Sequence, residues 1–149
     1  MPELTRVGEF TYEPAALPLL NRYRYVYFVT AKKPIAYPNG SSKVVYIGKF
    51  DNRDSRVHVP FSSLGWMVDH YIPRRAAEHV GVPVSLSLVD PGPSLNPLDC
   101  EGAFQNLFRQ KYGALPKGND KGGGPGAVPA AAKAGFTQKV ILDLLQVME

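Results

Sequence analysis

Hydrophobic and polar positions divide the 149-residue chain into a small number of elements. Residues 23–30 are largely apolar or aromatic on both alternating faces, which predicts a β-strand in the centre of a sheet. Residues 43–47 form a second β-rich run. The intervening residues 31–43 contain prolines, an asparagine and a glycine that favour turns. The pattern therefore predicts an antiparallel hairpin with a long connecting loop.

Further elements follow the hairpin. Alternation over residues 82–89 predicts a third strand, and periodicity near 3.6 predicts amphipathic helices over 98–112 and 136–149. Shorter helices are expected over 64–72 and 74–80. This order predicts an α+β fold, with a short central antiparallel or mixed sheet of about three strands flanked by helices.

A change of composition suggests how the chain is divided. Residues 121–135 are rich in glycine, proline and alanine, which is typical of a flexible linker. We therefore expect an N-terminal arm at 1–22, a core domain at 23–120, this linker, and a C-terminal helix at 136–149. The apolar face of that helix must be buried against its own core, a partner, or a second copy in a homodimer.

Charge and cysteine content restrict the function classes. The chain has 17 Lys and Arg residues against 13 Asp and Glu, giving a net charge of +4, which suits a phosphate-bearing partner without requiring one. The single cysteine excludes an internal disulfide and a cysteine-based metal site. The N-terminus has no signal-peptide pattern, and no apolar run approaches the roughly 20 residues of a membrane span. These features predict an intracellular protein without a membrane partner.

Several residues could carry chemistry, although each has a simpler structural explanation. Glu101 lies close to the apolar stripe of its helix, but acidic residues also favour helix N-termini. Tyr27 and Tyr46 could act in proton transfer, but strand tyrosines usually pack in a core. Arg56 could grip a phosphate, and His58 lies two residues beyond it, but runs of charge are usually solvated. Considered singly, these residues favour structural roles.

Taken together and in order, the same residues resemble the GIY-YIG nuclease family. Tyr25-Val26-Tyr27 corresponds to the first half of its motif, and Tyr46-Ile47-Gly48 reproduces the second half. Arg56 follows where the family has an arginine, Glu101 matches the glutamate of a later helix, and Asn119 matches a closing asparagine. The resemblance extends over about residues 23–119.

The sequence also departs from the family pattern. Tyr25 replaces the glycine of the first half-motif, and the loop 31–43 is longer than the usual connection. Arg53 competes with Arg56 for the arginine role, and Pro60 interrupts the helix expected to carry either residue.

The resemblance implies a DNA endonuclease that uses Mg²⁺ or Mn²⁺ to hydrolyse phosphodiester bonds. Glu101 would bind the metal, Tyr27 would act as general base, Tyr46 would position water or phosphate, and Arg56 would clamp the scissile phosphate, with help from His58 or Lys49. The substrate-binding residues would be Lys49, Asn52, Arg53 and Asn119, with Asn119 expected to fix the end of the core rather than to do chemistry.

The expected partner is double-stranded or branched DNA, and the expected location is the cytoplasm, as for a prokaryotic or phage-type enzyme. Dispersed lysines would hold backbone phosphates: Lys32, Lys33, Lys43, Lys111, Lys117 and Lys121. Two alternatives stay open. One is a catalytically inactive domain of the same fold that binds DNA or a protein, and the other is an adaptor that acts through its C-terminal helix.

Overall fold

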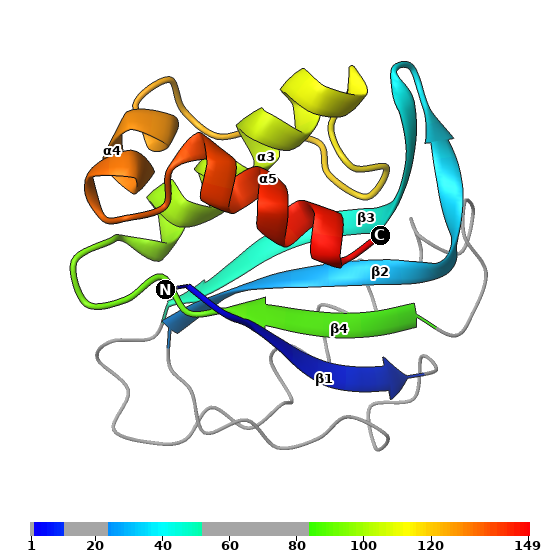
Figure 1. Cartoon of the computed structure of the whole chain (residues 1–149), viewed down its shortest axis with the longest axis horizontal. Helices are drawn as coiled ribbons and strands as arrows, with labels where there is room; N and C mark the ends of the chain where they lie inside the picture. The colour runs from blue at the N-terminus through cyan, green and yellow to red at the C-terminus, as the bar shows by residue number, and fades with distance from the viewer. Residues whose placement is uncertain (1, 11–23, 52–83) are drawn as a thin grey trace.

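The computed structural model describes residues 2–10, 24–51 and 84–149, and these form a sheet with helices on one face (Figure 1). The strands are β1 (Leu4–Phe10), β2 (Arg24–Tyr37), β3 (Gly40–Asp51) and β4 (Val84–Val89). They form one antiparallel sheet in the order β1-β4-β2-β3. The predicted α+β class is confirmed. The described sheet has four strands rather than about three, because β1, from the segment predicted as an arm, pairs with β4.

The β2–β3 hairpin is longer than the sequence predicted. Tyr37 pairs with Gly40, so the strands are joined by a tight turn at Pro38 and Asn39 rather than by a loop over 31–43. The pairing register shifts between Thr30 and Ile35, where β2 has more residues than β3. Extra residues in a strand interrupt its regular pattern without ending it, which is why the sequence pattern resembled a loop.

The helices α3 (Pro97–Tyr112), α4 (Ala127–Lys133) and α5 (Gln138–Val147) all cover the same face of the sheet (Figure 1). Alternation along β2 sends Val26 and Phe28 into this layer, where the ring centroids of Phe28 and Phe104 lie 4.9 Å apart. The Asn96 side chain caps α3 by accepting a hydrogen bond from the Leu98 amide. Gly113 ends the helix in the left-handed conformation.

The glycine- and alanine-rich segment is packed against the core, which corrects its interpretation as a flexible linker. Its residues 127–133 form α4, and Ala127 and Ala131 are buried. Just before this helix, a Cβ atom on Gly123 would lie only 2.2 Å from the Gly102 Cα, so glycine permits a close backbone approach to α3. The small residues therefore serve packing, which composition alone does not distinguish from flexibility.

The C-terminal amphipathic helix, α5, buries its apolar face within its own chain. Ile141 and Leu145 are fully buried in the same core as Phe104 and Phe108. Thr137 caps the helix, which therefore begins slightly later than the predicted residue 136. The apolar face on which both the homodimer and the adaptor interpretation relied is thus already occupied.

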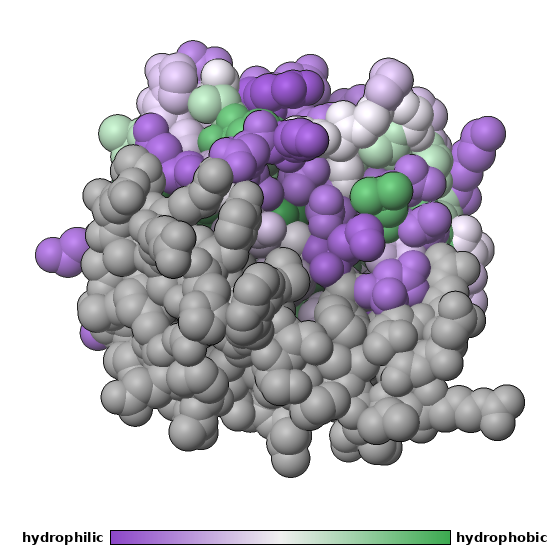
Figure 2. Space-filling model, turned by 180° about the vertical axis from the view of Figure 1, so that it is seen from behind, coloured by the Kyte–Doolittle hydropathy of each residue, from purple (hydrophilic) through white to green (hydrophobic). Residues whose placement is uncertain are grey.

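The other face of the sheet carries Tyr25, Tyr27 and Val29 from β2, with Leu86 and Leu88 opposite them on β4. Seen from behind, the coloured surface is mostly hydrophilic, with hydrophobic residues in small separate areas (Figure 2).

None of the helices in the described part of the chain has the length and apolar character to cross a membrane. The helices expected over 64–72 and 74–80 lie outside the described residues.

Candidate active site

Tyr27 occupies a space that only a glycine on the next strand can provide. Tyr27 on β2 pairs directly with Gly48 on β3, and its side chain is fully buried. A Cβ atom on Gly48 would lie 2.3 Å from the Tyr27 Cζ, well inside van der Waals contact. The ring of Tyr27 therefore lies across the backbone of Gly48. This accounts physically for the glycine of the Tyr46-Ile47-Gly48 sequence.

Three tyrosine rings form a cluster around this point. The rings of Tyr27 and Tyr46 are stacked, with centroids 5.8 Å apart and planes at 21°, and their side chains are hydrogen-bonded. The ring of Tyr25 meets Tyr27 edge to face at 6.4 Å. Burial, followed by the effects of Tyr46 and Glu101, raises the pKa of Tyr27 well above its usual value. Tyr27 is therefore a neutral phenol at neutral pH.

Glu101 approaches the tyrosine cluster from α3. The helix begins at Pro97, and the acidic residue of its first turn is Asp99, so favourable interaction with the helix N-terminus does not account for Glu101. The half-buried Glu101 accepts a hydrogen bond of 3.3 Å at Oε1 from Gln105 Nε2. Burial raises the pKa of Glu101, while the nearby charge of Lys49 and this hydrogen bond oppose the increase.

Two amide side chains bind the peptide groups of Ile47, between Tyr46 and Gly48. The Asn119 Oδ1 accepts from the Ile47 amide and its Nδ2 donates to the Ile47 carbonyl, both at 2.9 Å. Gln105 Nε2 donates to the same carbonyl at 3.1 Å. Because β3 is the outermost strand of the described sheet, Asn119 takes the place of a neighbouring strand there, together with the Gly118 amide, which donates to the Val45 carbonyl at 2.7 Å. Gln105 connects this edge to Glu101.

Arg24 holds the loop that leads into α3 and so helps to fix the position of Glu101. Its Nη1 donates to the Gly92 carbonyl at 3.2 Å and its Nη2 to the Leu95 carbonyl at 2.7 Å. Arg24 lies on β2, the strand that carries Tyr27. The same strand therefore positions both the tyrosine cluster and the start of the helix.

The structure brings together five of the residues predicted from sequence: Tyr27, Tyr46, Lys49, Glu101 and Asn119. Four others, Asn52, Arg53, Arg56 and His58, lie outside the described residues. Sequence reasoning missed Gln105, which is 3% exposed. A glutamine between buried Phe104 and Leu107, one helical turn beyond Glu101, was the available signal.

Glu101 suits a divalent cation of the Mg²⁺ type. Burial raises the pKa of this half-buried carboxylate despite the nearby charge of Lys49, so a bound cation would stabilise its ionised form, and oxygen is the ligand atom that Mg²⁺ prefers. Within residues 2–10, 24–51 and 84–149, no three His, Cys, Asp or Glu side chains are grouped as a metal cage. The residues thus fit a metal held by one carboxylate and otherwise by water and substrate phosphate.

Comparisons of the chain with protein-family models, curated proteins and solved structures found no match. The resemblance to GIY-YIG nucleases therefore depends on the residues and their arrangement.

Proposed function

We propose that this chain is a metal-dependent endonuclease that hydrolyses phosphodiester bonds in DNA. The observation that supports the proposal is the meeting of Tyr27, Tyr46 and Glu101 beside Gly48 at one edge of the sheet. Glu101 lies fifty positions beyond Asp51, the last residue of the hairpin, in sequence. Packing alone does not require a half-buried carboxylate beside two phenols, since burying a charge is unfavourable.

Glu101 would hold the metal, Mg²⁺ or Mn²⁺. When bound, the cation would polarise the attacked phosphate and lower the pKa of nearby water and phenol groups. Tyr27 would take a proton from the attacking water, for which its pKa must fall from the raised value of the isolated protein. Tyr46, hydrogen-bonded to Tyr27, would orient the water or the phosphate.

Basic residues would bind the DNA backbone. Arg56 or Arg53 would clamp the scissile phosphate through two parallel hydrogen bonds, with His58 or Asn52 assisting. Lys49 would contact the phosphate, and its charge also stabilises the ionised form of Glu101. Asn119 binds Ile47 through both ends of its amide, which favours a positioning role over direct contact with substrate. A DNA substrate agrees with the cytoplasmic location expected from the sequence.

One observation favours the alternative of an inactive domain that binds DNA or a protein. Tyr27 is fully buried, and its raised pKa is unfavourable for a general base. In such a domain the tyrosine cluster would be part of the core. Glu101 would then be a buried charge without a catalytic use.

Incubation of supercoiled plasmid with the purified chain separates the two functions. The proposal predicts nicked or linear plasmid in the presence of Mg²⁺, and intact plasmid when a chelator is added. A chain that retards the plasmid in a gel without cutting it, with either Mg²⁺ or Mn²⁺, would instead be the inactive DNA-binding domain.

A further inference from the structure

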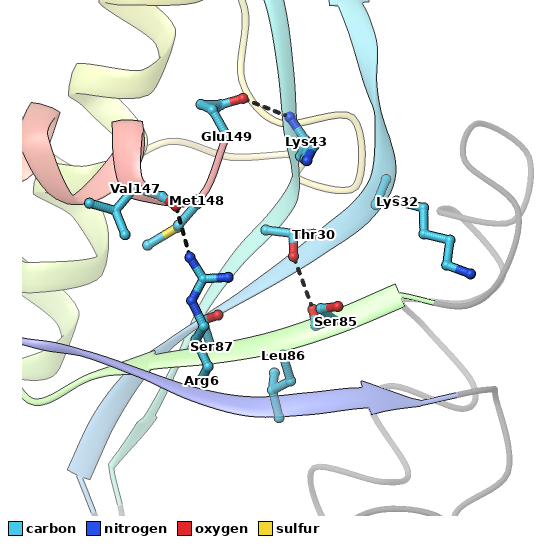
Figure 3. Close-up of a pocket in the computed structure, with 11 residues that line it drawn as sticks. Arg6, Thr30, Lys32, Lys43, Ser85, Leu86, Ser87, Val147, Met148 and Glu149 are labelled. Atoms are coloured by element: carbon cyan, nitrogen blue, oxygen red, sulfur yellow. Dashed lines mark hydrogen bonds between the residues drawn. The ribbon is translucent and has the colours of Figure 1, made fainter.

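A polar pocket lies beside the C-terminal end of α5, next to the strands of the sheet (Figure 3). Residues from the end of α5 and from all four described strands line it, and its volume is about 370 Å³. Small-molecule sites in proteins measure roughly 300–1,000 Å³. The pocket therefore has room for a small ligand.

Hydroxyl groups form the floor of this pocket. Thr30 on β2 pairs with Ser85 on β4, and its Oγ1 donates a long hydrogen bond of 3.5 Å to the Ser85 carbonyl. Ser87 lies two residues beyond Ser85 on β4, also lines the pocket, and is 6% exposed. A serine hydroxyl can donate a hydrogen bond, so Ser87 suits a ligand that supplies an acceptor.

Three cations line the pocket with these hydroxyl groups: Arg6, Lys32 and Lys43. The side chain of Arg6 rises from β1 and donates from Nη2 to the Val147 carbonyl at 3.1 Å (Figure 3). Neither this guanidinium nor the two ammonium groups form an ion pair with a carboxylate of the described segments. The positive charge in the pocket is thus left for a ligand.

The single acidic side chain of the pocket lining is already engaged. Glu149 accepts hydrogen bonds from the Ser42 hydroxyl, from the Lys43 amide at 3.0 Å and from the Tyr112 hydroxyl at 3.1 Å. These donors offset its negative charge. The remaining chemistry of the pocket is cationic and hydrogen-bond donating.

We propose that this pocket binds the phosphate group of a small molecule, either inorganic phosphate or a phosphate monoester such as a nucleoside monophosphate. Guanidinium, ammonium and hydroxyl groups together are the donors that proteins use for phosphate oxygens. None of the candidate active-site residues lines the pocket, and Tyr27 points to the other face of the sheet. The site is therefore separate from the proposed nuclease centre.

Titration calorimetry at constant ionic strength tests this site. Inorganic phosphate and adenosine 5′-monophosphate are titrated separately, with adenosine as the control that lacks phosphate. We expect binding of at least one phosphate compound and none of adenosine. Tighter binding of the nucleotide would identify a monoester as the ligand, and equal binding would identify phosphate alone.

Matched variants locate the binding. Lys32→Met is expected to weaken phosphate binding by about tenfold, since it removes one charged contact. Ser87→Ala is expected to weaken it as well, whereas Lys33→Met changes an exposed lysine that does not line the pocket and should leave binding unchanged. Absence of binding, or equal losses in the Lys32 and Lys33 variants, would overturn the proposal. A Lys32→Met variant that loses affinity for a short DNA duplex but keeps its affinity for phosphate would also overturn it.

Discussion

At the scale of single residues, Gly48 determines where the Tyr27 ring can lie. Replacement by alanine would place a methyl group 2.3 Å from Tyr27 Cζ, so the ring or the strand must move. Overpacking of this kind costs about 1–3 kcal/mol. We expect Gly48→Ala to lower the free energy of unfolding by this amount in a denaturant titration and to reduce any nuclease activity.

Gly124→Ala provides the control for that substitution. A Cβ at Gly124 meets no atom within 4 Å, so the same chemical change should leave stability nearly unaltered. Equal stability of the two variants would show that Tyr27 is not held across Gly48.

The hydroxyl of Tyr27 can be tested separately from its ring. Tyr27→Phe keeps the stacking on Tyr46 but removes the group proposed to accept a proton. General-base catalysis contributes roughly 100-fold to 10,000-fold, and we expect a rate loss in that range with unchanged DNA affinity. Single-turnover cleavage rates measure it. Tyr25→Phe, on the same strand and face, is the control, and a wild-type rate for Tyr27→Phe would remove its role as base.

The raised pKa of Glu101 has a consequence for stability. Because its pKa in the folded state exceeds the ordinary value of 4.5, folding favours the protonated form, and this stability is lost as the pH rises through the folded-state pKa. Glu101→Gln, which stays neutral, should therefore have a higher Tm than the wild type at neutral pH. The difference should shrink in thermal melts below pH 4.5. A lower Tm for the variant at neutral pH would contradict this account.

At the scale of elements, the Asn119 side chain and the Gly118 amide close the outer edge of β3, where the described residues provide no further strand. Asn119→Ala removes both hydrogen bonds to Ile47 and leaves its peptide groups without these partners. We expect a loss of about 1–3 kcal/mol and faster hydrogen exchange at the Ile47 amide. Asn106→Ala, whose amide contacts Gly124 instead, should leave that exchange rate unchanged. Slow exchange at Ile47 in both variants would show that Asn119 does not protect the edge.

The elements also show what the sequence could predict. Helix α3 was predicted nearly to the residue, because its apolar stripe and Gly113 are strong local signals. The extent of the hairpin was missed, because the register shift near Thr30 depends on pairing between strands. Helix α4 was missed, because the contact between Gly102 and Gly123 is tertiary and glycine-rich composition is equally typical of linkers.

The candidate site was predictable to a similar degree. Tyr27, Tyr46 and Glu101 came from a resemblance in motif order, and the fold brings them together. The link from Glu101 through Gln105 to Ile47 was not predictable, because a hydrogen bond to a backbone carbonyl on another element leaves no trace in residue spacing. Sequence thus indicated the reacting groups, while the structure identified the residues that hold them.

At the scale of the whole molecule, the two faces of the sheet carry different chemistry. The helical layer buries one face and leaves a cationic pocket at its margin, between α5 and the strands. The tyrosine cluster lies on the other face and reaches Glu101 at the edge of β3. Phosphate binding in the pocket and DNA cleavage at the edge can therefore be measured independently of each other.

The most direct test of the proposed nuclease compares plasmid nicking by the wild type, Glu101→Gln and Asp99→Asn in Mg²⁺. Asp99 lies in the first turn of the same helix and provides a matched loss of one carboxylate. The account predicts that the wild type and Asp99→Asn nick the plasmid, whereas Glu101→Gln is folded but inactive. Full nicking by Glu101→Gln would contradict it.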